Sequence, residues 1–185
     1  MKILFACDLH GDRAAVDELL KTFERERADR LVLLGDILYH GPRNDLPHAY
    51  DPKGVIALLN GKKDVILAVR GNCDTEVDQM VLDFPILADY AVLPLPNGGL
   101  AYLTHGHRYN EETPPPMTGK DILIHGHTHV AGLTKCRDGQ PCLNPGSVSI
   151  PKENSPHSYV VFENGKFEWK NLETGEIYME QKFCL

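Results

Sequence analysis

The stretch KILFACDLHGD, residues 2–12, joins a short apolar run to a polar turn that opens a second element. Residues 2–7 have the pattern of a buried strand. Asp12 can cap a helix, because apolar residues recur with helical spacing over residues 16–23. The same order continues along the chain, with strands expected over 30–34 and 64–69 and a helix over 52–60. This alternation predicts a parallel sheet with helices packed on it.

From about residue 84 the pattern changes to that of hairpins. Asn-Gly or Asp-Gly pairs at 97–98, 138–139 and 164–165 stand between apolar or alternating runs, which is a strong hairpin signal. We therefore expect a mainly antiparallel second half. Its strands are predicted over residues 90–95, 100–104, 121–125, 131–136, 158–162, 166–170 and 176–183. Because no long linker separates the halves, we expect one domain, residues 1–185, in which two mixed sheets pack face to face with helices outside.

The composition is that of a folded globular chain: 42% of the residues are hydrophobic and 24% are charged, which excludes a largely disordered protein. The net charge of −7 disfavours nucleic-acid binding, because affinity for the phosphate backbone comes from Lys and Arg. No apolar run approaches the roughly 20 residues of a membrane span, and residues 1–6 lack the pattern of a secretory signal. The five scattered cysteines form no CxxC pair, so we expect reduced thiols and a cytoplasmic location.

Polar side chains that can bind metal ions follow several of the predicted strands directly. In sheets of this kind ligands bind at the carboxyl ends of the strands, so the loops that carry these side chains can converge on one place. The i, i+2 pairs within them point to the same side if the chain is extended. The candidate ligands are Asp8, His10, Asp36, Asn72, His105, His127 and His129.

The number and type of these candidates favour two ions. Seven side chains are too many for one tetrahedral zinc, whereas two ions about 3.5–4 Å apart can share a bridging carboxylate. Mixed nitrogen and oxygen donors favour Mn²⁺, Fe or Zn²⁺ over Ca²⁺, and over Mg²⁺ less clearly. Two divalent ions, two carboxylates and a hydroxide leave a small positive charge, which suits the single negative charge of a phosphodiester.

The same motifs carry a family resemblance. The order D-x-H at 8–10, G-D at 35–36, G-N-C-D at 71–74, T-H-G-H at 104–107 and G-H-T-H at 126–129 resembles that of the calcineurin-like metallophosphoesterases. Asn144 to Ser147 is similar to the usual end of the pattern, so the likeness covers about residues 8–150. The stretches GDILYHGPRN and RGNCD are most similar to those of small bacterial phosphodiesterases of the YfcE type.

The resemblance implies a four-layer α-β-β-α sandwich and a metal-dependent phosphodiesterase that acts on small phosphodiesters. It implies a first metal held by Asp8, His10, Asp36 and His129. It implies a second held by Asp36, Asn72, His105 and His127, with Asp36 bridging and a metal-bridging hydroxide as nucleophile. The ions would be most simply Mn²⁺, with Fe, Zn²⁺, Co²⁺ or Ni²⁺ as alternatives. A phosphomonoesterase or protein phosphatase, a nuclease and a non-catalytic protein-binding scaffold of the same fold stay open.

Cys73 departs from a pattern seen in many members of the family, where histidine follows the motif asparagine. A thiol is a poorer proton donor at neutral pH, so we predict that His40 takes over this role. Asp74 is a third catalytic candidate, although a role in orienting its neighbours or capping the next helix is the alternative. We expect Arg43 and Asn72 to contact the substrate phosphate. The antiparallel second half offers a pairing surface, so a homodimer or larger homo-oligomer is a candidate assembly.

Overall fold

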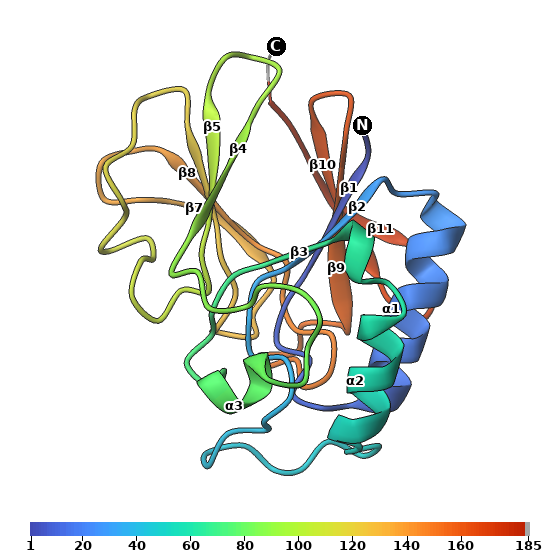
Figure 1. The fold of residues 1–185 in the computed structure, drawn as a ribbon. Helices are drawn as coiled ribbons and strands as arrows, with labels where there is room; N and C mark the ends of the chain where they lie inside the picture. Colours follow the sequence, from blue (N-terminus) through green and yellow to red (C-terminus); the bar gives the residue numbers. More distant parts are fainter. Residues whose placement is uncertain (184–185) are drawn as a thin grey trace.

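The computed structural model describes residues 1–183, which form two mixed sheets with three α-helices (Figure 1). The first sheet has the strand order β11-β10-β9-β1-β2-β3, and the second has the order β4-β5-β6-β8-β7. The strands are β1 (Ile3–Ala6), β2 (Arg30–Leu33), β3 (Ile66–Ala68), β4 (Ala91–Pro94), β5 (Leu100–Leu103), β6 (Ile122–Ile124), β7 (Gly132–Lys135), β8 (Pro141–Asn144), β9 (Ser158–Glu163), β10 (Lys166–Asn171) and β11 (Ile177–Lys182). The helices are α1 (Arg13–Glu26), α2 (Pro52–Asn60), α3 (Glu76–Gln79) and the 3₁₀ turn η1 (Lys63–Val65).

The two longer helices begin where the sequence places their caps. The Asp12 side chain accepts a hydrogen bond from Ala15 N at the start of α1, and the Asp51 side chain accepts one from Gly54 N at the start of α2. Such caps satisfy backbone N–H groups that have no partner within the helix. The apolar faces of α1 and α2 pack against the first sheet, where they bury residues such as Val16 and Leu59 (Figure 1).

A second apolar core fills the space between the two sheets. Phe5 of β1, Val160 of β9 and Leu143 of β8 belong to one buried cluster there. Trp169 of β10 is fully buried in the same cluster, and its indole N–H donates to Asn144 O of β8 at 2.8 Å. This bond satisfies the one polar atom that a buried tryptophan brings into the core, so it joins the sheets without a desolvation penalty.

The predicted arrangement of two mixed sheets is confirmed, with differences in detail. β8 was not predicted, and residues 63–65 form a 3₁₀ turn rather than the start of β3. The centre of the second sheet is parallel, since β5 pairs with β6 and β6 with β8 in parallel register. Hairpin signals report only neighbours joined by short turns, so they do not reveal pairs joined by long loops. Within residues 1–183, loop residues such as Met117, rather than a helix, pack on the outer face of this sheet.

No helix in this described part of the chain has both the length and the apolar character needed to cross a membrane.

Glu26, at the end of α1, ties the helix to the first sheet through a small polar cluster. Its Oε1 accepts hydrogen bonds from Tyr159 Oη at 3.0 Å and Lys170 Nζ at 2.8 Å, and its Oε2 lies 3.4 Å from Lys2 Nζ. Partial burial by itself raises the pKa of Glu26. The bonds from Lys170 and Tyr159 and the charge of Lys2 outweigh this effect and hold the pKa below its usual range. The charged form is therefore favoured by folding.

We expect Glu26→Gln to lower the free energy of unfolding by about 1–3 kcal/mol at pH 7, because it removes the charge from two hydrogen bonds. The folded-state pKa is depressed, so this contribution is complete above the unfolded-state pKa of about 4.3 and is lost as the pH falls through the lower folded-state value. Urea denaturation from pH 7 downward should show the two proteins converging below about pH 4. A gap that stays constant with pH would show that packing, not charge, causes the loss.

Candidate metal and active site

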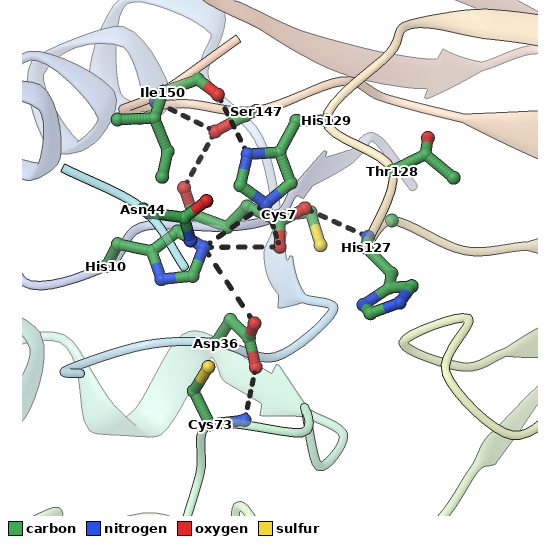
Figure 2. Close-up of polar contacts among 12 residues, drawn as sticks. Cys7, His10, Asp36, Asn44, Cys73, His127, Thr128, His129, Ser147 and Ile150 are labelled. Atoms are coloured by element: carbon green, nitrogen blue, oxygen red, sulfur yellow. Dashed lines mark hydrogen bonds and ion pairs between the residues drawn. The ribbon is translucent and has the colours of Figure 1, made fainter. Parts of the chain in front are cut away.

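Five loops bring the seven predicted metal ligands together at one end of the two sheets. They follow β1, β2, β3, β5 and β6, at the carboxyl end of each strand. Figure 2 shows four of these ligands, His10, Asp36, His127 and His129. Backbone hydrogen bonds connect the first two loops, since Leu9 N and His10 N both donate to Asp36 O. The close packing depends on glycine: a Cβ at Gly71 would collide with Asp36, and a Cβ at Gly126 would collide with the Cys7 side chain.

Three of these side chains meet on one side of the site. Asp8 Oδ1 lies 3.6 Å from His10 Nε2 and 3.3 Å from His129 Nε2, and the two imidazole nitrogens are 3.3 Å apart. All three residues are buried. Their ligand atoms therefore surround a space of the size that one metal ion would fill.

A second group meets beside the first. His105 Nε2 lies 3.0 Å from Asn72 Oδ1 and 3.2 Å from His127 Nδ1. Asp36 belongs to both groups, because its Oδ2 lies 3.4 Å from His105 Nε2 and 3.8 Å from His10 Nε2. The Asp36 carboxylate thus stands between the two groups.

Backbone carbonyls set the orientation of the imidazole rings. The Nδ1 atoms of His10, His129 and His105 lie 2.7–2.8 Å from the carbonyl oxygens of Tyr39, Ile150 and Leu34. A carbonyl only accepts, so each Nδ1 carries a proton, and Nε2 presents a lone pair whenever the ring is neutral. This is the way in which histidines that bind metals are commonly held.

The donor chemistry fits a cation. Asp8 Oδ1 is buried and has no hydrogen-bond donor, although two imidazole nitrogens stand close to it. Acceptors that face acceptors in a buried site leave a free-energy cost that a positive ion removes. Oxygen and nitrogen donors of this kind suit Mn²⁺, Fe or Zn²⁺.

The two carboxylates are ionised at neutral pH. Burial by itself raises the pKa of Asp8, but the contacts with His10 and His129 hold it well below its usual range. Burial likewise raises the pKa of Asp36, while His105 outweighs it and lowers the value. For His105, burial lowers the pKa and the two carboxylates raise it to about 9. Burial and the His105 charge lower the pKa of His127 to about 4, which keeps that ring neutral.

The backbone of this site is unusual in a way that the sequence did not suggest. Asp8, His10, Asp36, His127 and His129 all have a positive φ, between 46° and 71°. We expected the i, i+2 pairs to lie in extended chain, and this expectation is wrong. Each pair sits in a tight left-handed turn, and His127 and His129 point to different halves of the site. Such conformations cost of order 1 kcal/mol or more each and cluster at functional sites.

Asp74 holds the Asp36 loop in place. Its Oδ2 accepts from Asp36 N at 2.9 Å and from Gly71 N at 2.7 Å, and its Oδ1 accepts from Ile37 N at 2.8 Å. The next helix is capped by Thr75 instead. Burial raises the pKa of Asp74 despite these bonds. The carboxylate contacts backbone rather than the cavity.

A cavity of about 390 Å³ opens over the ligand cluster. Asp36, Asn72 and His127 form part of its wall, and Cys73 and Arg43 line it as well. Burial and the Asp36 charge raise the pKa of the Cys73 thiol, so the group is protonated at neutral pH.

His40 is not among the residues that line this cavity. Its ring packs edge-on against Tyr39 and Tyr50, with centroids 4.7 and 5.4 Å away. Its Nδ1 is buried without a hydrogen-bond partner. A role for His40 in proton transfer stays a prediction, and it requires the loop to turn this ring toward the cavity.

Sequence reasoning missed several residues of the site. Lys152, Thr128 and Asn44 line the cavity (the latter two are labelled in Figure 2). The hydroxyls of Ser147 and Ser149 both donate to the Asp8 carbonyl, at 2.9 and 2.8 Å. Ser147 lies within the Asn-Pro-Gly-Ser motif, which was a signal of its importance, whereas no local pattern singles out Lys152.

Comparison with known proteins agrees with this geometry. Residues 1–166 match the model of the calcineurin-like phosphoesterase superfamily domain. The chain is 46% identical to phosphodiesterase YfcE of Escherichia coli strain K12 over 164 residues, which cover 89% of this chain and 88% of that protein. It is 26% identical to the probable metallophosphoesterase YsnB of Bacillus subtilis strain 168, over 87% of this chain and 83% of that one.

Among solved structures, that of the E. coli phosphoesterase Yfce superposes with a TM-score of 0.93 at 42% identity. The superposition covers 98% of this chain and 99% of that one. The chain therefore belongs to the calcineurin-like phosphoesterase superfamily, a family of hydrolases.

Proposed function

We propose that this chain is a phosphodiesterase that hydrolyses small phosphodiesters at a site for two divalent metal ions. One observation carries the proposal: the Asp36 carboxylate stands between two imidazole groups, 3.8 Å from His10 Nε2 and 3.4 Å from His105 Nε2. Asp8, His10, Asp36 and His129 would hold one ion, and Asp36, Asn72, His105 and His127 the other. When bound, two such ions polarise a phosphoryl oxygen and make hydroxide available for attack on phosphorus. The name of the E. coli relative supports the same activity.

The chain's own groups favour a diester over a monoester. A monoester dianion calls for additional cations at the cavity. Arg70 is paired with Glu76 at 3.4 Å, and Arg108 with Asp89 at 2.8 Å. Arg43 and Lys152 line the cavity, and both are exposed enough to reach a phosphate oxygen. Every predicted ligand position carries a side chain that can bind metal, which disfavours the scaffold alternative.

Further parts of the proposal concern the setting of the enzyme. We take Mn²⁺ as the resident ion, with Fe, Zn²⁺, Co²⁺ or Ni²⁺ as alternatives, because the donors are oxygen and nitrogen. We place the enzyme in the cytoplasm and allow for a homodimer or larger homo-oligomer. Elemental analysis, fractionation and light scattering test these three points separately.

A substrate panel tests the function. Purified protein with Mn²⁺ should hydrolyse bis-p-nitrophenyl phosphate and small diesters such as cyclic nucleotides, and a chelator should abolish the reaction. Turnover of p-nitrophenyl phosphate on the same preparation should be lower, because Arg70 and Arg108 are paired with carboxylates and leave Arg43 and Lys152 as the cations of the cavity wall that can meet a second negative charge. Faster monoester than diester turnover would favour the phosphatase alternative. No turnover with Mn²⁺, Co²⁺, Ni²⁺ or Zn²⁺ would reject the proposal.

We expect His40→Ala to lower the turnover of a diester with a poor leaving group by about 10²-fold, the usual contribution of a general acid. A diester with a p-nitrophenyl leaving group, which leaves without protonation, should be hydrolysed at nearly the normal rate. His48→Ala, an exposed position in the same loop, is the matched control. If both diesters are hydrolysed normally by His40→Ala, His40 has no part in the proton transfer.

A further inference from the structure

A second cluster of metal-binding side chains lies on the outer face of the five-stranded sheet. Glu111, His125 and Cys142 each present one ligand atom, and these atoms lie within 4.8 Å of one another. Leu143, the neighbour of Cys142 on β8, points into the core between the sheets. Cys142 therefore faces the opposite side, because side chains alternate along a strand. None of the three residues lines the catalytic cavity.

Cys136 is a fourth candidate ligand that packs beside Cys142, outside the group of three whose ligand atoms lie within 4.8 Å of one another. It follows β7, and its N–H donates to Gln140 O at 2.8 Å, which closes the hairpin that leads into β8. Cys136 and Cys142 then pack together with Leu123 in one small buried cluster, separate from the core between the sheets. Both cysteines are free thiols and almost fully buried.

His125 Nε2 and Glu111 Oε2 lie close together, and neither atom provides a hydrogen for a bond between them. His125 Nδ1 lies 3.0 Å from Gly126 O, which places the proton on Nδ1 and leaves a lone pair on Nε2. This Nε2 is 3.1 Å from Glu111 Oε2, a buried oxygen that has no hydrogen-bond partner. A cation between the two atoms would satisfy both of them.

We propose that Glu111, His125, Cys136 and Cys142 bind a structural Zn²⁺ that is independent of the catalytic ions. Two thiolates, an imidazole and a carboxylate make up a tetrahedral set that zinc accepts. Thiolate donors disfavour Mn²⁺ and Mg²⁺, so this site and the catalytic site, whose predicted ligands are oxygen and nitrogen atoms, select different metals. The Gly126 carbonyl orients the imidazole, as outer-shell acceptors do in zinc sites.

The position of the site indicates what the ion does. Glu111 belongs to the loop of residues 104–121, which begins beside His105, and Arg137 N donates to Glu111 O at 2.9 Å. His125 stands between β6 and the catalytic pair His127 and His129. A bound zinc would therefore fasten this loop and the hairpin after β7 to the strand that leads into the catalytic centre. Binding releases the two thiol protons to solvent.

Co²⁺ substitution of the full-length chain tests the site by spectroscopy. Co²⁺ at a thiolate site gives an intense near-ultraviolet charge-transfer band, which oxygen and nitrogen ligands do not give. We expect this band in the wild-type protein and in Cys73→Ser, which changes the thiol at the catalytic cavity. We expect Cys142→Ser to abolish the band and Cys136→Ser to weaken it. In zinc titrations of protein already loaded with Mn²⁺, Cys142→Ser should lose one tight equivalent.

The cysteine variants can fail to fold because both cysteines are buried, so Glu111→Gln provides a second test. Glu111 is only half-buried, and this variant should therefore fold. It should keep the thiolate band yet weaken zinc binding by at least about 10-fold, the minimum for loss of an outer-shell partner. A band that persists in Cys142→Ser, equal zinc stoichiometry in the two proteins, or a Cys136–Cys142 disulfide in protein purified under reducing conditions would each overturn the proposal.

Discussion

Asp36→Asn is expected to lower kcat/KM for bis-p-nitrophenyl phosphate by at least about 100-fold, the upper end of the loss caused by removing an outer-shell partner alone. The carboxylate contacts both halves of the site, because its Oδ2 lies 3.8 Å from His10 Nε2 and 3.4 Å from His105 Nε2. Asn removes its charge and leaves one oxygen, so the two ions can no longer share an anionic ligand. Elemental analysis after Mn²⁺ loading and desalting should show that the variant retains less metal per chain than the wild type.

The substitution leaves the local fold intact, which makes the result interpretable. Asp36 Oδ1 accepts a hydrogen bond from Cys73 N at 2.8 Å, and the carbonyl of Asn can accept the same bond. Asp29→Asn, at an exposed carboxylate that precedes β2, at the opposite end of this strand from Asp36, should retain full activity and metal content. Normal metal content together with normal turnover in Asp36→Asn would contradict the dinuclear arrangement.

The sequence predicted that the candidate ligands gather at one edge of the sheets, because that prediction needs only the positions of strand ends. Asp8, Asp36, Asn72 and His105 each follow a strand, and parallel pairing brings those ends to one edge. The sequence did not predict the directions in which the ligand side chains point. A motif such as D-x-H records spacing but no dihedral angles. The left-handed turns at Asp8 and His10 arise because backbone bonds to the neighbouring loop fix the chain there.

Residues that are brought into place by contacts distant in the sequence could not be predicted from the sequence either. Lys152 reaches the cavity wall because its N–H donates to His129 O across 23 residues of chain. The cluster of Glu111, His125 and Cys142 was hidden for another reason. Its members come from a loop, a strand end and the one strand, β8, that was not predicted, so the shared outer face could not be recognised.

Asp74→Asn is expected to destabilise the protein by about 2–4 kcal/mol and to weaken Mn²⁺ binding together. Asp74 accepts hydrogen bonds from three backbone N–H groups, at Asp36, Ile37 and Gly71. The side-chain carbonyl of Asn can accept the bonds made by one of the two carboxylate oxygens. Its NH₂ group takes the place of the other oxygen and faces a backbone N–H, so these two buried donors have no acceptor. Burial raises the pKa of Asp74, so removal of the buried charge offsets part of this loss.

The effect on metal distinguishes a positioning role from a merely structural one. Asp74 fixes the N–H groups of Asp36 and of its neighbour Ile37, so its loss should let the Asp36 loop shift. We expect the Mn²⁺ concentration for half-maximal activity to rise by about 10–100-fold in Asp74→Asn at a temperature where the variant is fully folded. Asp78→Asn is the matched control, because this half-buried carboxylate only caps α3 and its loss should cost about 1 kcal/mol without changing the Mn²⁺ requirement. If Asp74→Asn loses stability but keeps the wild-type Mn²⁺ requirement, Asp74 supports the fold and does not position the metal ligands.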